Sequence, residues 1–345
     1  MQKDRFVGCL LGVAIGDALG APFENMPAEE IAQIPGAGER YFDGSVNTHR
    51  FAGMQELKPG DWTDDTQLTL AVARSFQPDG RFDMDRVARE HIDESTRPFG
   101  WGGTTRKAVR RLAEGTHWSQ SAEPNGAGNG VVMKIAPLGL AESLNQDIRL
   151  LKSEGLNEQG LALGRMTHGH PAAVIAGVVH ANVISVFACL DAQTAVSSGG
   201  GNAFVNLTSG LAAFHEKAVE SHEPLISSIF IRLGKLGLSG RLDQMTAQQI
   251  AAEFGGGTKA VFTAWNSVGT AYACFLRNQN SFKSVQQAVL CGGDADSNAS
   301  IVGSLLGALH GPSIFPAELV AGLNRREEVV KTAELLHEAV SRRTE

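Results

Sequence analysis

The hydrophobic pattern of this chain is helical along most of its length. Apolar residues recur at three- and four-residue spacing, sustained alternation is scarce, and aromatic residues make up only 6%. Alanine and glycine are frequent within the helical segments, so the helix axes can approach closely. The pattern predicts one all-α domain over residues 1–345, and the rival is an α/β fold with short strands such as 131–135. Helices are predicted over 6–20, 65–76, 84–96, 104–113, 158–167, 171–190, 194–198, 203–221, 223–235, 247–254, 260–276, 282–291, 297–309 and 327–342.

Two of these segments are apolar enough to resemble membrane segments. Segment 6–15 follows two basic residues, as in a leader peptide, but glycine recurs every fourth residue and Asp17 ends the apolar run. Segment 171–190 is long enough to span a bilayer, yet it carries His180 and Asn182 and lacks flanking basic anchors. We interpret both as buried core helices and expect no membrane association.

Composition narrows the class of protein further. Hydrophobic residues make up 43% and charged residues only 19%, which argues against disorder. The net charge of −7 argues against a nucleic-acid surface, which needs clustered lysine and arginine. The four cysteines form no C-x-x-C motif, so we expect reduced thiols and a cytoplasmic protein.

The chemistry is concentrated in two acidic clusters near opposite ends of the chain, each directly before a helical segment. Carboxylate and hydroxyl oxygens are the ligands that hard divalent cations prefer. Helix capping explains one or two of these residues, but adjacent carboxylates repel each other unless a cation lies between them. Together the clusters predict a two-metal hydrolase. They are Asp61-Trp62-Thr63-Asp64-Asp65-Thr66 and Asp294-Ala295-Asp296-Ser297-Asn298.

The helices beside these clusters share a ladder of small residues. Positions 8, 12, 16 and 20 are glycine, and positions 299, 303, 307 and 311 are alanine or glycine. Because both ladders have a spacing of four, we expect the two helices to pack directly together.

Three further motifs carry candidate chemistry. Asp17 is costly to bury without a partner, and Glu24 follows on the exit loop, where it is either a surface residue or a cleft carboxylate. The turn 126–130 is glycine-rich and suits a diphosphate, although an ordinary flexible loop is equally compatible. His168 and His170 next to a proline could bind a metal, but stacking or hydrogen bonding fits a helix junction better.

These motifs, in this order, resemble the ADP-ribosylglycohydrolase family, which includes dinitrogenase reductase-activating glycohydrolases and ADP-ribosylhydrolases. The resemblance implies a compact, orthogonal, all-α domain with a central cleft that holds two Mg²⁺ or Mn²⁺ ions. The matching segments are 16–20, 63–66, 128–130 with Met133 and Lys134, 167–168 and 292–299.

The resemblance also implies roles for single residues. The expected metal ligands are Thr63, Asp64, Asp65, Asp294, Asp296 and Ser297. The expected catalytic residues are Glu24, Asp65 and Asp296. The expected substrate contacts are Asp17, Gly128, Asn129, Gly130, Met133 and His168.

The chain departs from the family pattern at three positions. Ser297 stands where threonine is usual, which preserves the hydroxyl, and Lys134 stands where arginine is common. Gly100 stands where many members carry an aspartate that is a candidate base. The loss of that carboxylate places more weight on Glu24.

The expected activity is hydrolysis of the glycosidic bond of an ADP-ribosyl group on a modified protein side chain or small acceptor, which releases ADP-ribose. The substrate would then be an ADP-ribosylated protein or a small ADP-ribosyl compound. Two alternatives stay open. One is a two-metal phosphohydrolase acting on a nucleotide or on the ADP-ribose diphosphate, and the other is a non-catalytic ADP-ribose-binding protein of the same fold. The acceptor and the oligomeric state stay open as well.

Overall fold

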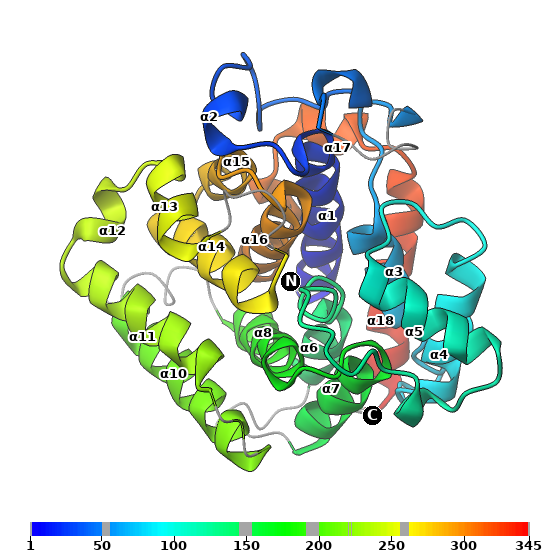
Figure 1. The fold of residues 1–345 in the computed structure, drawn as a ribbon. Helices are drawn as coiled ribbons and strands as arrows, with labels where there is room; N and C mark the ends of the chain where they lie inside the picture. The colour runs from blue at the N-terminus through cyan, green and yellow to red at the C-terminus, as the bar shows by residue number, and fades with distance from the viewer. Residues whose placement is uncertain are drawn as a thin grey trace.

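The computed structural model describes residues 2–49, 56–144, 154–190, 200–219, 221, 223–255 and 262–343. Within these residues all regular structure is helical, and β-pairing is limited to isolated bridges (Figure 1). The predicted all-α class is therefore confirmed. The α/β alternative is wrong, because residues 131–134 form a turn that leads into a short helix.

A close-packed pair of helices far apart in the sequence forms the centre of the fold. Helix α1 (Gln2–Gly20) lies beside α16 (Ala295–His310), as Figure 1 shows. A Cβ atom added to Gly12 would lie 2.0 Å from the carbonyl oxygen of Gly303, so the two backbones touch. At the other end, a Cβ on Gly20 would lie 2.4 Å from Asp296 Cα. The glycine ladders therefore pack as predicted, and the C-terminal end of α1 meets the acidic N-terminal end of α16.

The remaining helices surround this pair (Figure 1). On one side lie α3 (Asp64–Arg74), α4 (Met84–Glu94), α5 (Gly103–Ala113) and α18 (Arg326–Arg343). Next to them lie α6 (Ala136–Glu142), α7 (Glu154–Thr167) and α8 (Pro171–Cys189). The other side is built from α10 (Gly200–Ala218), α11 (Leu225–Leu238), α12 (Arg241–Gln244), α13 (Ala247–Phe254), α14 (Ala264–Arg277) and α15 (Lys283–Leu290). The short helices α2 (Ala28–Ile31) and α17 (Ala317–Gly322) lie near the α15 end of the molecule.

The two most apolar helices are core helices of this arrangement. Within the described residues, Gln2–Phe23 and Pro171–Cys189 are long and apolar enough to cross a membrane by length and composition. However, 94% of the apolar window in the first and 83% in the second are buried inside the protein. Packing against other helices therefore accounts for their apolar composition.

Most predicted helices agree with the structure to within a few residues. Helix α6 was not predicted, because a proline and a glycine interrupt its short apolar pattern. The glycine has a packing reason, since a Cβ on Gly139 would lie 2.2 Å from the carbonyl oxygen of Ala181. The short helices α2, α12 and α17 were also missed. The predicted helix 194–198 lies outside the described residues.

Candidate active site

A cavity of about 800 Å³ lies where the two acidic clusters meet the glycine-rich turn. All of the predicted site residues line it except Asp17 and Thr63. The predicted residues along its wall are Glu24, Asp64, Asp65, Gly128, Asn129, Gly130, Met133, His168, Asp294, Asp296 and Ser297. The fold therefore gathers residues that are more than two hundred positions apart into one site.

Asp17 lies behind this cavity and holds the start of α3 in place. Its Oδ1 accepts a hydrogen bond from Thr63 Oγ1 at 2.8 Å, and the Thr63 N–H lies 2.9 Å from both carboxylate oxygens. Its Oδ2 accepts from the N–H of Thr66 at 2.9 Å and from Thr66 Oγ1 at 2.6 Å. Asp17 thus caps a helix from another element. The expected substrate contact is not seen, because Asp17 does not line the cavity.

Thr63 also lies outside the cavity wall. It is the N-cap residue of α3, but its hydroxyl donates to Asp17 and makes no capping bond of its own. This bond uses the hydroxyl proton and leaves the oxygen lone pairs, so the expected metal contact of Thr63 stays a prediction. The cap that Asp17 supplies presents the next two residues, Asp64 and Asp65, to the cavity.

Four carboxylates form the floor of the cavity. The side chains of Asp64, Asp65, Asp294 and Asp296 belong to residues that are at most 7% exposed. Burial raises the pKa of Asp64 to about 8, and the neighbouring charges of Asp296 and Asp17 add to this effect. Burial and the surrounding carboxylates also raise the pKa of Asp65 and Asp294 well above the usual range. Such a cluster is unfavourable unless a cation or protons neutralise it.

The donor set of this floor fits a hard divalent cation. Ser297 Oγ donates to Asp65 Oδ2 at 3.1 Å, while the buried Asp65 Oδ1 has no hydrogen-bond partner in the described residues. An oxygen-only set with an unpaired carboxylate oxygen is what Mg²⁺ and Mn²⁺ favour. Among the described residues, no three His, Cys, Asp or Glu side chains converge closely enough to hold a metal by themselves. Hydroxyl and water oxygens would therefore have to complete the coordination.

The glycine-rich turn is fixed to the acidic floor by one side chain. The Asn129 amide nitrogen donates to Asp294 Oδ2 at 2.5 Å and to Ser267 Oγ at 2.9 Å. The backbone of the turn pairs with another segment through Asn129 N–H to the Phe262 oxygen and Ala264 N–H to the Ala127 oxygen, both at 3.0 Å. Asn129 therefore also aligns the turn with the carboxylates.

His168 lies against this turn in a neutral form. The residue is 1% exposed, and its Nδ1 lies 2.8 Å from Thr167 Oγ1. Burial lowers its pKa to about 3, and the nearby charge of Lys134 adds to this effect. His170 has a different role, because its Nδ1 accepts from the N–H of Ala172 at the start of α8. The hydrogen-bonding interpretation of these histidines therefore fits better than a shared metal.

Gly100 contributes backbone to the cavity wall in a conformation that favours glycine. Its φ is +82°, and an added Cβ would lie 2.8 Å from Asp64 Oδ1 and 3.0 Å from Thr63 Cβ. An aspartate would therefore be strained at this position. Glu24 lines the same cavity, and its charge helps to raise the pKa of Asp294. The role of Glu24 as the base stays a prediction, and water bound to a metal is the alternative.

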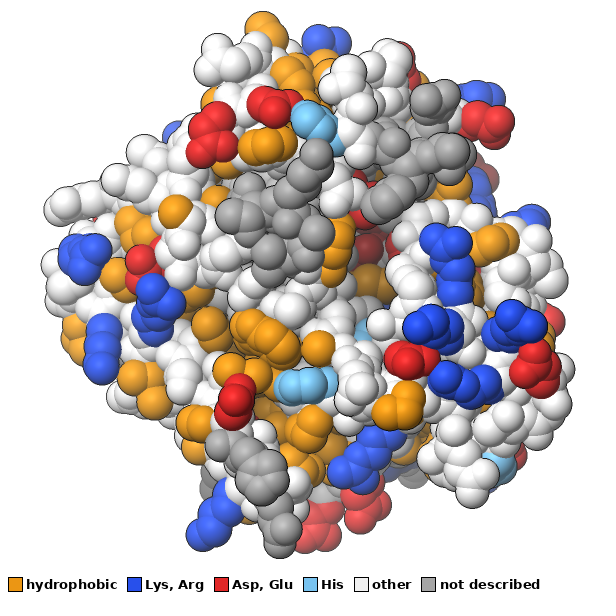
Figure 2. All heavy atoms as spheres, in the orientation of Figure 1, with side chains coloured by type: hydrophobic (Ala, Val, Ile, Leu, Met, Phe, Trp, Pro, Cys, Tyr) orange, Lys and Arg blue, Asp and Glu red, His pale blue; other side chains and the backbone are white. Residues whose placement is uncertain are grey.

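The sequence reasoning missed the wall formed by the start of α5. Residues 102–107 line the cavity, and neither an acidic residue nor a side-chain cap occupies the first turn of the helix. Arg106 and Lys107 line this wall, and Figure 2 shows basic side chains gathered on the side of the molecule where α5 lies in Figure 1. The signal was present as a Gly-Gly pair before Thr104, which marks a helix start with free N–H groups. This wall favours anions, in contrast to the acidic floor.

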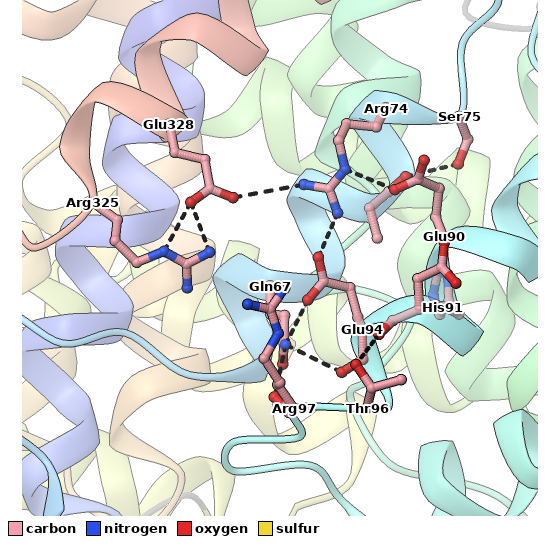
Figure 3. A network of polar contacts seen from close by, with 12 residues as sticks. Gln67, Arg74, Ser75, Glu90, His91, Glu94, Thr96, Arg97, Arg325 and Glu328 are labelled. Atoms are coloured by element: carbon pink, nitrogen blue, oxygen red, sulfur yellow. Dashed lines mark hydrogen bonds and ion pairs between the residues drawn. The ribbon is translucent and has the colours of Figure 1, made fainter.

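A polar network holds this wall against α3. Gln67 Oε1 accepts from Trp101 Nε1 at 2.6 Å, and Gln67 Nε2 donates to Glu94 Oε2 at 2.6 Å. Arg74 in turn pairs with Glu94 at 2.6 Å and with Glu90 at 2.7 Å, as Figure 3 shows. The loop that carries Gly100 is therefore tied to the helix that carries Asp64 and Asp65.

A family model described as ADP-ribosylglycohydrolase matches residues 1–345. The chain belongs to the ADP-ribosylglycohydrolase family. An ADP-ribosyl-(dinitrogen reductase) glycohydrolase of Rhodospirillum rubrum is 29% identical, and the match covers 94% of this chain and 92% of that protein. The ADP-ribosylhydrolase ARH3 of Mus musculus is 27% identical, with 96% and 91% covered.

A solved structure titled "ADP-ribosylglycohydrolase-related protein complex" has the same fold. Its TM-score is 0.67 at 25% sequence identity, and the match covers 98% of this chain and 99% of that one. The resemblance drawn from the motifs is therefore confirmed. The names of the family relatives support ADP-ribosyl hydrolase activity at the level of the family.

Proposed function

We propose that this protein is a metal-dependent hydrolase that cleaves the N- or O-glycosidic bond of ADP-ribosyl groups and releases ADP-ribose. The observation that carries the proposal is one cavity with two opposed kinds of wall. Buried carboxylates form a floor whose charge suits cations, while the glycine-rich turn and the start of α5 form a wall that suits anions. An ADP-ribosyl group needs both, because it has vicinal ribose hydroxyls and a diphosphate.

The floor residues would hold two Mg²⁺ or Mn²⁺ ions through Asp64, Asp65, Asp294, Asp296 and Ser297. When bound, such ions polarise ribose hydroxyls and lower the pKa of water. Asp65 and Asp296 orient the reacting sugar and water from opposite helices, α3 and α16. Glu24 is the candidate to move a proton at the glycosidic bond, where charge develops in an oxocarbenium-like state.

The wall formed by the glycine-rich turn and the start of α5 would bind the diphosphate mainly through backbone N–H groups. Gly128 and Gly130 allow the backbone of the turn to approach a ligand closely, and His168 stays neutral beside them. The first turn of α5, which no side chain caps, would add backbone N–H groups, and the exposed Arg106 and Lys107 add positive charge. Met133 also lines the cavity, with its Sδ 3.9 Å from Ser297 Oγ.

The test is release of ADP-ribose from arginine-linked, serine-linked and O-acetyl substrates, with Mg²⁺ or Mn²⁺ and with a chelator. The wild-type protein should release intact ADP-ribose only with metal present. Asp296→Asn should lower turnover at least about 100-fold, because a ligand and a charge are lost together. Asp243→Asn, on the exposed surface of α12, should leave it unchanged.

Three results would contradict the proposal in different ways. AMP and ribose phosphate as products would indicate a phosphohydrolase. Binding of ADP-ribose without turnover on any substrate would indicate a binding protein of the same fold. Full turnover in the chelator would remove the metals from the mechanism. We further propose a cytoplasmic location, since all four cysteines are free thiols.

A further inference from the structure

A fully buried lysine lies behind His168. Lys134 is 0% exposed, and its Nζ donates to Thr167 Oγ1 at 3.2 Å. In the part of the chain that the structure describes, this hydroxyl is the one acceptor recorded for the ammonium group. Burial lowers the pKa of Lys134 to about 7, while the charge of Asp64 acts in the opposite direction. Burying a cation with so little compensation is costly, so a packing role alone does not account for a lysine here.

The direction of the hydrogen bonds follows from the chemistry of the three side chains. A lysine ammonium group donates and cannot accept. The Thr167 hydroxyl therefore accepts from Lys134 and keeps its own proton for another partner. That partner is His168 Nδ1, at 2.8 Å from Thr167 Oγ1. Because Nδ1 then accepts, the single proton of the neutral ring lies on Nε2.

The Nε2 edge of the ring faces the glycine-rich turn. A Cβ added to Gly130 would lie 2.8 Å from His168 Cε1 and 3.2 Å from Nε2, and one on Gly128 would lie 3.6 Å from Nε2. Both glycines and His168 line the cavity. The Nε2–H group is thus held at the wall that would take the anionic part of a ligand.

We propose that Lys134 is a positioning residue that acts through Thr167 to fix the Nε2–H tautomer of His168. The histidine then presents a neutral hydrogen-bond donor to an oxygen of the bound ADP-ribosyl group. This inference rests on the proposed function for the identity of the ligand. The tautomer itself depends only on the protein.

Two matched pairs of variants test the relay. Thr167→Ser keeps the hydroxyl and Thr167→Val removes it, whereas Lys134→Arg keeps a donor and Lys134→Met removes it. ¹⁵N spectra of histidine-labelled full-length protein at pH 6, with the His168 signal assigned from His168→Asn, report the tautomer. Wild type, Thr167→Ser and Lys134→Arg should show the proton on Nε2. Thr167→Val and Lys134→Met should show a mixture or the Nδ1–H form.

Calorimetric titration with ADP-ribose supplies the second readout. Thr167→Val and Lys134→Met should bind about tenfold more weakly, as expected for one misdirected hydrogen bond, while their matched partners stay within about twofold of wild type. An Nδ1–H tautomer in the wild type, or an unchanged tautomer in Thr167→Val, would overturn the relay. If the wild-type protein does not bind ADP-ribose, the proposed function fails, and the spectra alone decide the role of Lys134.

Discussion

The contact between α1 and α16 predicts that a methyl group added to a glycine of this contact destabilises the fold. In Gly12→Ala the new Cβ would lie 2.0 Å from the carbonyl oxygen of Gly303, against 3.4 Å or more for an ordinary contact. The helices must therefore separate locally by about 1.4 Å, because neither atom belongs to a flexible side chain. Overpacking of this kind costs about 3 kcal/mol, and the higher helix propensity of alanine returns at most about 1 kcal/mol. The expected net loss is about 2 kcal/mol.

Gly210→Ala on α10 is the matched control. A Cβ at this position meets no atom within 4 Å, so only the gain in helix propensity remains. The variant should be about 0.5–1 kcal/mol more stable than wild type. Urea denaturation followed by circular dichroism measures both variants through the shift of the midpoint. A Gly12→Ala protein as stable as wild type, or two variants shifted equally in the same direction, would refute the backbone-to-backbone contact.

Three further predictions concern the site. In Asp17→Asn, at least one backbone N–H at the start of α3 would face the N–H group of the new amide. The affinity for divalent cations, measured by calorimetry, should therefore fall at least about tenfold. Thr66→Ser keeps the hydroxyl and should keep the affinity. Burial raises the pKa of Asp64 to about 8, so the folded state holds this proton more tightly than the unfolded chain. The metal-free protein should therefore lose stability as pH rises from ~5 to ~8, with a shallower slope for Asp64→Asn and recovery in Mg²⁺; equal slopes for the two proteins would contradict this. Gly100→Asp should lower the free energy of unfolding by about 1–3 kcal/mol without raising turnover. Gly102→Asp, where a Cβ meets no atom within 4 Å, should leave the free energy of unfolding unchanged. A Gly100→Asp enzyme more active than wild type would reverse our assignment of the base.

The proposed function requires an acidic protein to bind an anionic substrate. The net charge of −7 argued against a nucleic-acid surface and not against a small anion, and the carboxylates at the cavity floor contribute to that charge. The anion-favouring wall is local and comes from backbone N–H groups with Arg106 and Lys107 at the rim. Overall charge therefore does not predict the ligand here, because a cavity presents its own local field.

Much of the helical framework was predictable because a helix is a local structure. Helix α13 (Ala247–Phe254) has the predicted bounds, and α8 ends one residue from the prediction. Helix α6 was missed because Pro137 and Gly139 break the local pattern, although burial against α8 stabilises the segment as a helix. Tertiary packing thus decided the elements whose local signal is weak.

The residue types that could bind a ligand were predictable from the sequence, but the structural roles of single residues were less so. The oxygen-bearing residues before α3 and α16 indicated a cation site, and the structure gathers them at one cavity. The partner of Asp17, the bond from Asn129 to Asp294 and the anion-favouring start of α5 were not predictable. Each depends on the relative placement of segments that the sequence pattern treats as independent.

By itself, the sequence determined that the chain is helical, that two small-residue ladders can pack closely, and that oxygen ligands flank them. These properties depend on residues within one or two turns of each other. Only the tertiary structure decided that Ser297 meets Asp65, that Asp17 caps α3, and that Gly100 adopts a positive φ beside Asp64. Burial, hydrogen-bond partners and pKa shifts depend on atoms distant in sequence. The chemistry of the site can therefore be inferred only once the packing of the helices is known.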